Sequence, residues 1–213
     1  MVLVTGFEPF GGEKLNPSWE ICRQLSQTLI DGMVVEACMV PCEFHRSIEV
    51  VAAAIGRHHP KLVICLGQAG GRSRLGVERV AINVDDARAA DNGGAQPVDE
   101  PIVADGPPAY FASVPIKAMA VAMRAAGAPA EVSNSAGTYV CNHLMYGVLH
   151  YLAAGGNRTR AGFIHVPYCE AQVLDKREAP FMAMATMVNG VRAAIAAARE
   201  HQHDLKIEEG AEK

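Results

Sequence analysis

The sequence predicts an α/β fold in which a largely parallel sheet carries helices on both faces. Short apolar runs at residues 1–5, 33–39 and 61–66 are typical of buried strands. Helical patterns lie between them: one begins at Asn16-Pro17-Ser18, where an N-cap candidate precedes proline, and an amphipathic one covers residues 43–57. Because strands that alternate with helices are joined by crossovers, neighbouring strands run parallel and the helices cover the sheet.

The rest of the chain continues this alternation. Strands are expected at 80–84, 131–135 and 162–166, and helices at 115–126, from about Thr138 to about Ala154, and at about 178–201. Glycine-rich loops follow the first and third strands at 6–12 and 67–71. Residues 85–110 are rich in Asp, Asn, Gly and Pro, which indicates a functional loop or one that contains a small hairpin. We therefore expect a single domain over residues 1–205 and a polar tail over 206–213 that frays.

Composition argues against several classes of protein. The chain has 213 residues and a net charge of −4, with no clustered basic surface, so neither nucleic acid nor an anionic membrane is an expected partner. We interpret Arg72 and Arg74 as part of a solvated face. No apolar run approaches 18 residues, and the N-terminus lacks the basic start and long apolar core of a secretory signal. These features predict a soluble cytoplasmic protein.

Six cysteines are spread over the chain, and without a signal sequence they are expected to be reduced thiols. They are Cys22, Cys38, Cys42, Cys65, Cys141 and Cys169. No CxxC pair occurs, which argues against a structural zinc site. Most of the six are expected to be small buried hydrophobic residues.

Cys141 differs from the others in its place along the chain. A strand ends before Ala136-Gly137, Thr138 is an N-cap candidate, and Cys141 then falls in the first turn of a helix. The unpaired N–H groups and positive end of the helix dipole favour a thiolate there, and they can also receive an oxyanion. Cys141 is therefore a candidate nucleophile, with a buried structural cysteine as the alternative.

His165 is the preferred base for this thiol. It ends the strand at 162–166, and the carboxyl ends of parallel strands border the crevice in which open α/β sheets bind ligands. His143 is two residues from Cys141 on one helix and points elsewhere. His58 and His59 lie at a helix end, and His201 and His203 lie in the tail. A third group should orient the imidazole, and the candidates are Glu78, Asp85, Asp86 and Asp91. Their spacing does not choose among them.

A set of long motifs, taken in order, resembles the pyroglutamyl peptidase I (pyrrolidone-carboxylate peptidase) family. The match runs from residue 1 to about residue 200. Its motifs are Thr-Gly-Phe-Glu-Pro-Phe-Gly-Gly at 5–12, Asn16-Pro17-Ser18, Gly67 to Gly71, Glu78 to Asn83, Asp85 to Arg88, Ser133 to Gly137, Val140-Cys141-Asn142 and His165-Val166-Pro167. The stretch 72–77 and the segment 89–110 are less diagnostic.

The resemblance implies a cytosolic cysteine peptidase on a single-domain three-layer α/β/α sandwich with a twisted, mostly parallel (mixed) sheet. It implies removal of N-terminal pyroglutamate from small peptides, a homotetramer, and neither metal nor cofactor. Carried over by motif, Cys141 is the nucleophile, His165 the base and Glu78 the residue that orients it. The substrate-binding residues implied in the same way are Phe7, Phe10, Asn16, Gln68, Arg88 and Val140.

Physical chemistry explains the implied roles of some of these residues and offers alternative roles for others. The aromatic side chains of Phe7 and Phe10 suit a small, flat, uncharged lactam, and the amide of Gln68 offers a donor and an acceptor in complement. Arg88 is expected near the oxyanion, with an ion pair to a neighbouring aspartate as the alternative. For Asn16, the alternative is the N-cap role.

Three other functions have weaker support in the sequence. Gly6 and Gly11 follow a strand as in a phosphate loop, but the Lys-Ser/Thr pair and a GxGxxG motif are missing, and Glu8 and Glu13 would repel phosphate. A non-catalytic binding protein would keep the aromatic pocket with an inert Cys141. A cysteine amidase of different specificity on the same scaffold is the third.

Overall fold

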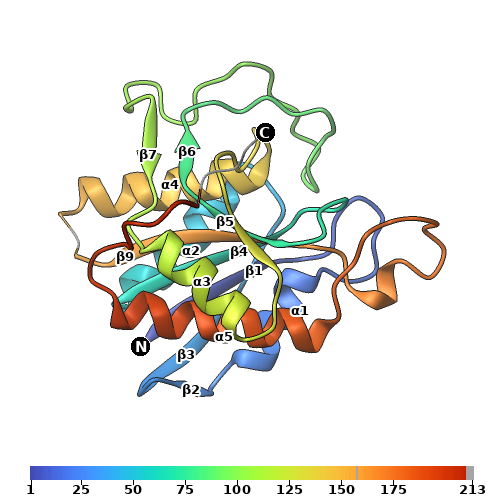
Figure 1. Cartoon of the computed structure of the whole chain (residues 1–213). Helices are drawn as coiled ribbons and strands as arrows, with labels where there is room; N and C mark the ends of the chain where they lie inside the picture. Colours follow the sequence, from blue (N-terminus) through green and yellow to red (C-terminus); the bar gives the residue numbers. More distant parts are fainter. Residues whose placement is uncertain (157, 210–213) are drawn as a thin grey trace.

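The computed structural model describes residues 1–156 and 158–209, and it confirms the α/β class. A seven-stranded sheet has the order β2-β3-β1-β4-β9-β5-β8 (Figure 1). Its strands are β1 (Val2–Phe7), β2 (Leu29–Ile30), β3 (Met33–Val40), β4 (Leu62–Gln68), β5 (Leu75–Glu78), β8 (Ala130–Ser133) and β9 (Arg160–Val166). A separate ribbon pairs β6 (Val80–Ile82) with β7 (Ala109–Phe111), so the segment 85–110 is mostly the connection between these two strands. Inside this fully described segment, Asp85 and Glu100 form only an isolated antiparallel bridge.

The sheet is mixed. β1 pairs in parallel with β3 and β4, β4 with β9, and β5 with β8. β2 is antiparallel to β3, and β5 is antiparallel to β9. The sequence predicted neither β2 nor β5. β2 has two residues, and β5 has four with a glycine in the middle, so each is too short for a period-2 pattern to stand out.

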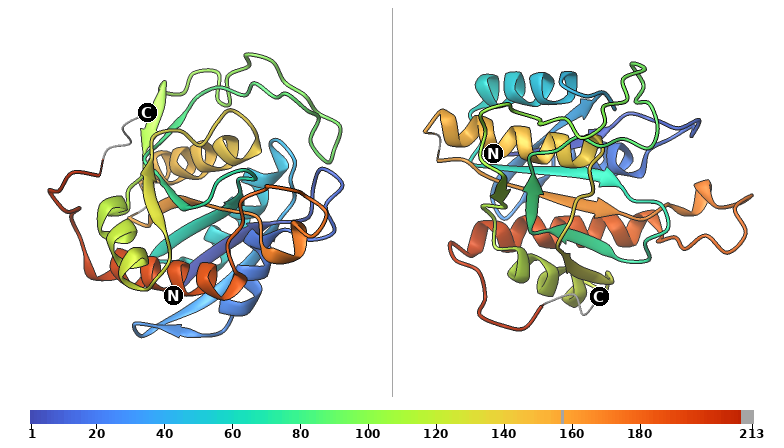
Figure 2. Two further views of the ribbon diagram at one scale, coloured as in Figure 1. Left: turned by 45° about the vertical axis from the view of Figure 1, so that its right-hand side comes forward. Right: turned by 90° about the horizontal axis from the view of Figure 1, so that it is seen from above.

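Helices cover both faces, which makes three layers (Figure 2). They are α1 (Pro17–Leu25), α2 (Arg46–His58), α3 (Ile116–Ala125), α4 (Val140–Ala154) and α5 (Met184–Glu200). α1, α3 and α5 bury one apolar cluster against the sheet, and α2 and α4 bury a second on the other face. Each fully buried Leu or Ile in these clusters contributes about 1.5–3 kcal/mol, so the two cores hold the sheet in place. No helix in the described part of the chain is long and apolar enough to cross a membrane.

Two helix boundaries differ from those expected. α2 begins at Arg46 instead of residue 43, because His45 adopts a positive φ of 57°. α5 begins at Met184 instead of residue 178, after a short 3₁₀ turn at Glu170–Gln172 and a loop. In both cases the segment before the helix bonds to other parts of the fold, and helical periodicity does not report such contacts.

The last described residues, up to Glu209, lie along α3. Asp204 accepts backbone hydrogen bonds from Lys117 and Ala118, and Glu209 forms an ion pair with Arg124. Residues 210–213 of the expected tail lie outside the described residues.

Candidate active site

His165 lies near the carboxyl end of β9, between two glycines on the neighbouring strands. Its partner in β4 is Gly67, and its partner in β5 is Gly76. A side chain at Gly76 would meet the guanidinium of Arg72, with 2.6 Å between its Cβ and Nη1. The two glycines therefore leave room for functional groups around the imidazole.

Cys141 is the second residue of α4, in the first turn, as the sequence predicts. Its Sγ atom lies 2.8 Å from the position that a Cβ on Gly67 would occupy, a distance that only glycine permits. Side chains of directly paired strand neighbours point to the same face of a sheet. The thiol of Cys141 and the imidazole of His165 therefore lie on one face, at the same end of the sheet.

Glu78 is the last residue of β5 and holds the imidazole. Its Oε1 lies 2.7 Å from Nδ1 of His165, and the two residues are 0% and 4% exposed. A proton on Nδ1 satisfies this hydrogen bond and leaves the Nε2 lone pair free to accept a proton. Among the four acids that spacing left open, the structure places Glu78 on His165.

The other three acids bond elsewhere. Asp85 Oδ2 lies 2.7 Å from Nδ1 of the buried His143, whose Nε2 accepts the backbone N–H of His45. Asp91 accepts backbone hydrogen bonds from Phe44, Gly93 and Ala95. Asp86 is exposed, and its backbone bonds to Thr138. The contacts of Asp85 and Asp86 hold the long loop after β6 against α4 and the residues before it, and those of Asp91 hold it against the residues before α2.

Arg72 is a member of the site that the sequence analysis missed, and its assignment to a solvated face is wrong. Its Nη1 lies 2.9 Å from Glu78 Oε1, and its Nη2 donates to the carbonyl of Ser135. The side chain is 33% exposed, so it closes the site toward solvent. The only sequence signal for it is its position between a glycine turn and the strand that carries Glu78. Arg74, by contrast, forms a surface ion pair with Glu131.

The charges around the triad act in opposite directions. Burial alone would disfavour the ionised form of Glu78, but the hydrogen bond and charge of His165, together with Arg72, hold the pKa of this carboxyl below its ordinary value. Burial raises the pKa of the Cys141 thiol, and the charge of Glu78 acts in the same direction while Arg72 opposes it. The helix position alone would favour a thiolate, whereas burial keeps the resting thiol protonated, so its attack requires a base.

The start of α4 has no side-chain cap. Tyr139 is its N-cap residue and makes no capping hydrogen bond. The expectation that Thr138 is the N-cap is wrong, because its hydroxyl donates to the carbonyl of Asp86. The first-turn N–H groups beside Cys141 therefore donate no hydrogen bond to a capping side chain, and they can donate to an oxyanion.

An apolar cluster borders Cys141 on this face of the sheet. Phe7, at the end of β1, and Val140 are buried in it, and Phe10 and Cys141 pack against it. The motif residues Phe7, Phe10 and Val140 thus belong to one cluster with the nucleophile candidate.

Two further motif residues have their polar groups engaged within the protein. Asn16 caps α1: its Oδ1 accepts the N–H and hydroxyl of Ser18, and its Nδ2 donates to the carbonyl of Glu8. The Oε1 of Gln68, at the end of β4, accepts from Nε2 of Gln172, 2.8 Å away. Gln172 in the 3₁₀ turn was not identified from the sequence, because a single glutamine in a connecting segment belongs to no periodic pattern or motif that would mark it as functional.

Arg88 does not join the triad's hydrogen bonds. It is exposed and makes no hydrogen bond or ion pair to any residue that the structure describes. The ion pair to a neighbouring aspartate is therefore not formed, and the arginine at the triad is Arg72.

Comparison with known proteins places the chain in a family. The profile of the pyroglutamyl peptidase family matches residues 1–201. The pyrrolidone-carboxylate peptidase of Yersinia pestis (strain Pestoides F) is 50% identical over 210 residues, which cover 99% of this chain and 98% of that protein. The crystal structure of pyroglutamyl peptidase I from Bacillus amyloliquefaciens superposes with a TM-score of 0.95 at 42% identity, over 97% of this chain and 98% of that one.

A variant of the pyrrolidone carboxyl peptidase from Pyrococcus furiosus is also similar, with a TM-score of 0.90 and 42% identity over 93% of this chain and 98% of that one. The agreement in sequence and in fold extends over nearly the whole chain, and it includes the strands and the helix that carry Glu78, His165 and Cys141. The chain belongs to the pyroglutamyl peptidase family of cysteine peptidases.

Proposed function

We propose that this chain removes N-terminal pyroglutamate from peptides by acyl transfer to Cys141. The observation that carries the proposal is the 2.7 Å bond between His165 Nδ1 and Glu78 Oε1, beside a thiol packed over Gly67. A nucleophile, a base and a group that orients the base are the parts that nucleophilic catalysis of acyl transfer requires. The family membership supplies the acyl group.

In the first half of the reaction, His165 Nε2 takes the proton of the Cys141 thiol as sulfur attacks the pyroglutamyl carbonyl. Glu78 stabilises the imidazolium that forms, because it is ionised and hydrogen-bonded to Nδ1. The oxyanion of the tetrahedral intermediate is received by the uncapped N–H groups at the start of α4. The imidazolium then protonates the leaving amine, the C–N bond breaks, and a thioester remains.

In the second half, His165 takes a proton from water, which attacks the thioester carbonyl. The carbon–sulfur bond breaks, the sulfur recovers its proton from the imidazolium, and free pyroglutamate leaves. The two half-reactions use the same base, so removal of His165 should stop both.

Specificity follows from the neutral character of the apolar cluster. Phe10, partly exposed at the edge of the cluster that buries Phe7 and Val140, offers an aromatic face for a flat lactam ring. An N-terminal glutamate would carry an ammonium and a carboxylate into these apolar surroundings. Gln68 and Asn16 are proposed in this shell on the strength of the motifs. Their contacts to Gln172, Ser18 and Glu8 support a role in shaping it. Arg88 is proposed near the oxyanion on the strength of its motif, and its exposed guanidinium pairs with no residue in the described part of the chain.

Small peptides are the proposed substrates, and no nucleic acid or membrane is proposed as a partner. A homotetramer in the cytoplasm is proposed from the resemblance. The six free cysteines of the described chain agree with a reducing compartment.

The test is a series of fluorogenic amides with pyroglutamyl, prolyl, glutamyl and leucyl acyl groups. Wild-type protein under reducing conditions should release the amine from the pyroglutamyl amide with a kcat/KM at least a hundredfold above the others, and His165→Ala should release none while remaining folded. Preference for another acyl group would instead favour a cysteine amidase of different specificity. No turnover by folded protein would favour a binding protein.

A further inference from the structure

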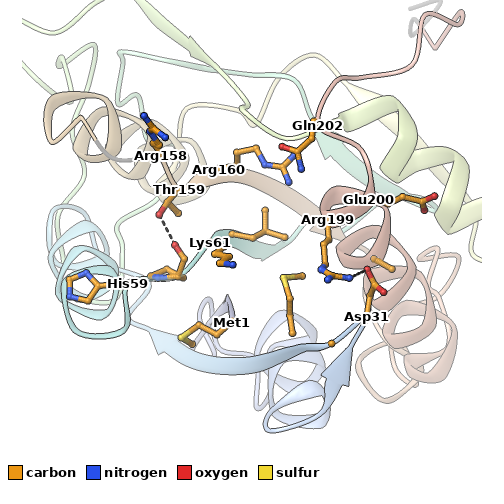
Figure 3. Close-up of a pocket in the computed structure, with 15 residues that line it drawn as sticks. Met1, Asp31, His59, Lys61, Arg158, Thr159, Arg160, Arg199, Glu200 and Gln202 are labelled. Carbon is orange, nitrogen blue, oxygen red and sulfur yellow. Dashed lines mark hydrogen bonds and ion pairs between the residues drawn. The ribbon is translucent and has the colours of Figure 1, made fainter.

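A pocket lies at the amino ends of the sheet strands, at the opposite end of the sheet from Cys141. This amino-end pocket has a volume of about 1130 Å³ and is bordered by the start of β4, the start of β9 and the C-terminal end of α5 (Figure 3). β4 and β9 run in parallel from Leu62 and Arg160 at this pole to Gly67 and His165 at the active site. The pocket is therefore separated from the triad by the length of the strands.

Cationic side chains dominate the lining. Lys61, Arg158, Arg160 and Arg199 border the pocket, against two carboxylates, Asp31 and Glu200. Arg199 pairs with Asp31, and Glu200 points away from the middle of the pocket (Figure 3). The chain as a whole has a net charge of −4, whereas the lining of this pocket is positively charged.

Two of these cations have no counter-ion in the described part of the chain. Lys61 and Arg158 are exposed, and their side chains make no hydrogen bond or ion pair to the residues 1–156 and 158–209 that the structure describes. Like charges gathered without partners repel one another, so an anion that enters between them relieves this repulsion.

The other two are held in fixed orientations. The guanidinium of Arg160 donates from Nη1 to the carbonyl of His201, 2.8 Å away, and from Nη2 to the carbonyl of Ala198, at the end of α5. Arg199 is oriented by Asp31. A guanidinium carries five N–H donors, so each retains donors for a ligand after these bonds.

We propose that the amino-end pocket binds a linear phosphate chain, either free or as part of a nucleotide. Oriented guanidinium groups match phosphate oxygens in pairs, and the lysine ammonium adds a mobile point charge. Four cations against two carboxylates leave a net charge of +2 spread around a pocket of about 1130 Å³, so an extended polyanion reaches more of the cations than one small monoanion would.

The test measures binding of inorganic tripolyphosphate and of ATP to the full chain by isothermal titration calorimetry, without divalent metal. Wild type should bind both saturably, with an affinity that falls as NaCl is raised. The double variant Lys61→Gln/Arg158→Gln should bind at least tenfold more weakly. The matched control Arg46→Gln/Arg74→Gln removes the same charge from distant surface ion pairs and should bind as wild type does.

Tighter binding of ATP than of tripolyphosphate would identify a nucleotide as the source of the phosphate chain, and equal binding would identify the chain itself. Absence of saturable binding to wild type would overturn the proposal. Equal weakening in both double variants would do the same, because it would show unspecific attraction. A rise in KM for the pyroglutamyl amide on addition of tripolyphosphate would place the anion at the active site and also contradict it.

Discussion

The Sγ atom of Cys141 lies 2.8 Å from the position that a Cβ atom on Gly67 would occupy. This close approach sets the thiol over the strand next to β9 and thereby beside His165, the partner of Gly67 in the sheet. The geometry of the proposed site thus depends on the absence of one side chain as well as on the presence of three.

Gly67→Ala should therefore damage catalysis directly. Its new methyl group would meet Sγ at 2.8 Å and the ring of Phe163 at 2.7 Å, so the thiol or the ring must move. We expect kcat/KM to fall at least a hundredfold, with a loss of about 1–3 kcal/mol in the free energy of unfolding from overpacking. The control is Gly56→Ala in α2, where the nearest atom is 3.8 Å from the new methyl group. This variant should keep full activity, and its free energy of unfolding should rise by about 0.5–1 kcal/mol.

Glu78→Gln tests the charge of the orienting residue separately from its hydrogen bond. Glutamine can still accept from Nδ1 of His165, but it cannot stabilise an imidazolium by charge. We expect kcat to fall by about 10²–10⁴ with a small change in KM. An activity within threefold of wild type would show that the carboxylate has no electrostatic role.

The same substitution predicts a change in the pH dependence of stability. The pKa of Glu78 is lower in the folded protein than in the unfolded chain, so its ionisation stabilises the fold at pH values above the ordinary glutamate pKa of about 4.3. This contribution is lost as the pH falls through the lower, folded value. Urea unfolding of wild type and Glu78→Gln should therefore differ most near pH 7 and converge in acid. A difference that stays constant, or grows on acidification, would contradict the assignment.

Arg72→Met should move the pH–rate profile. The arginine opposes the rise in the pKa of the Cys141 thiol. Without it, the alkaline limb of the kcat/KM profile, which reports the thiol, should shift to higher pH, by less than about one unit because Arg72 is partly solvated. Arg72→Lys should shift this limb less. Arg74→Met removes a surface cation nearby in sequence and should leave the profile unchanged.

The buried pair His143–Asp85 should carry stability rather than chemistry. Removing one partner leaves the other buried and unpaired, at a cost of about 3–5 kcal/mol. We expect His143→Leu and Asp85→Leu each to destabilise by about this amount in urea unfolding, and the double variant to lose less than the sum of the two. Strict additivity would mean that the two side chains do not interact. His58→Ala at the end of α2 should change stability by no more than about 0.5 kcal/mol.

The fold class could be predicted from the sequence because the long strands and helices show their own periods. The apolar run at residues 61–66 corresponds to β4, and the predicted helix that contains Cys141 corresponds to α4. β5 could not be predicted in this way. Its four residues are antiparallel to β9, and that pairing is fixed by distant contacts instead of local preference.

The residues of the proposed triad could be predicted from the sequence for a different reason. Cys141 and His165 lie at a helix start and a strand end, positions that a sequence reveals, but only the motif resemblance chose Glu78 over three aspartates. Arg72 and Gln172 were missed because their roles arise from contacts across the fold, with Glu78 and Gln68. Arg88 was placed by a motif, and the structure leaves it exposed without a partner among the described residues.

The central claim is that one thiol among six is the nucleophile. Its most direct test is the kcat/KM for a pyroglutamyl amide of Cys141→Ala, compared with alanine variants of the other five cysteines, all checked for folding by circular dichroism. Turnover by Cys141→Ala should fall to background while the other five variants remain within tenfold of wild type. Retained turnover in folded Cys141→Ala, or its loss in one of the other five instead, would contradict the account.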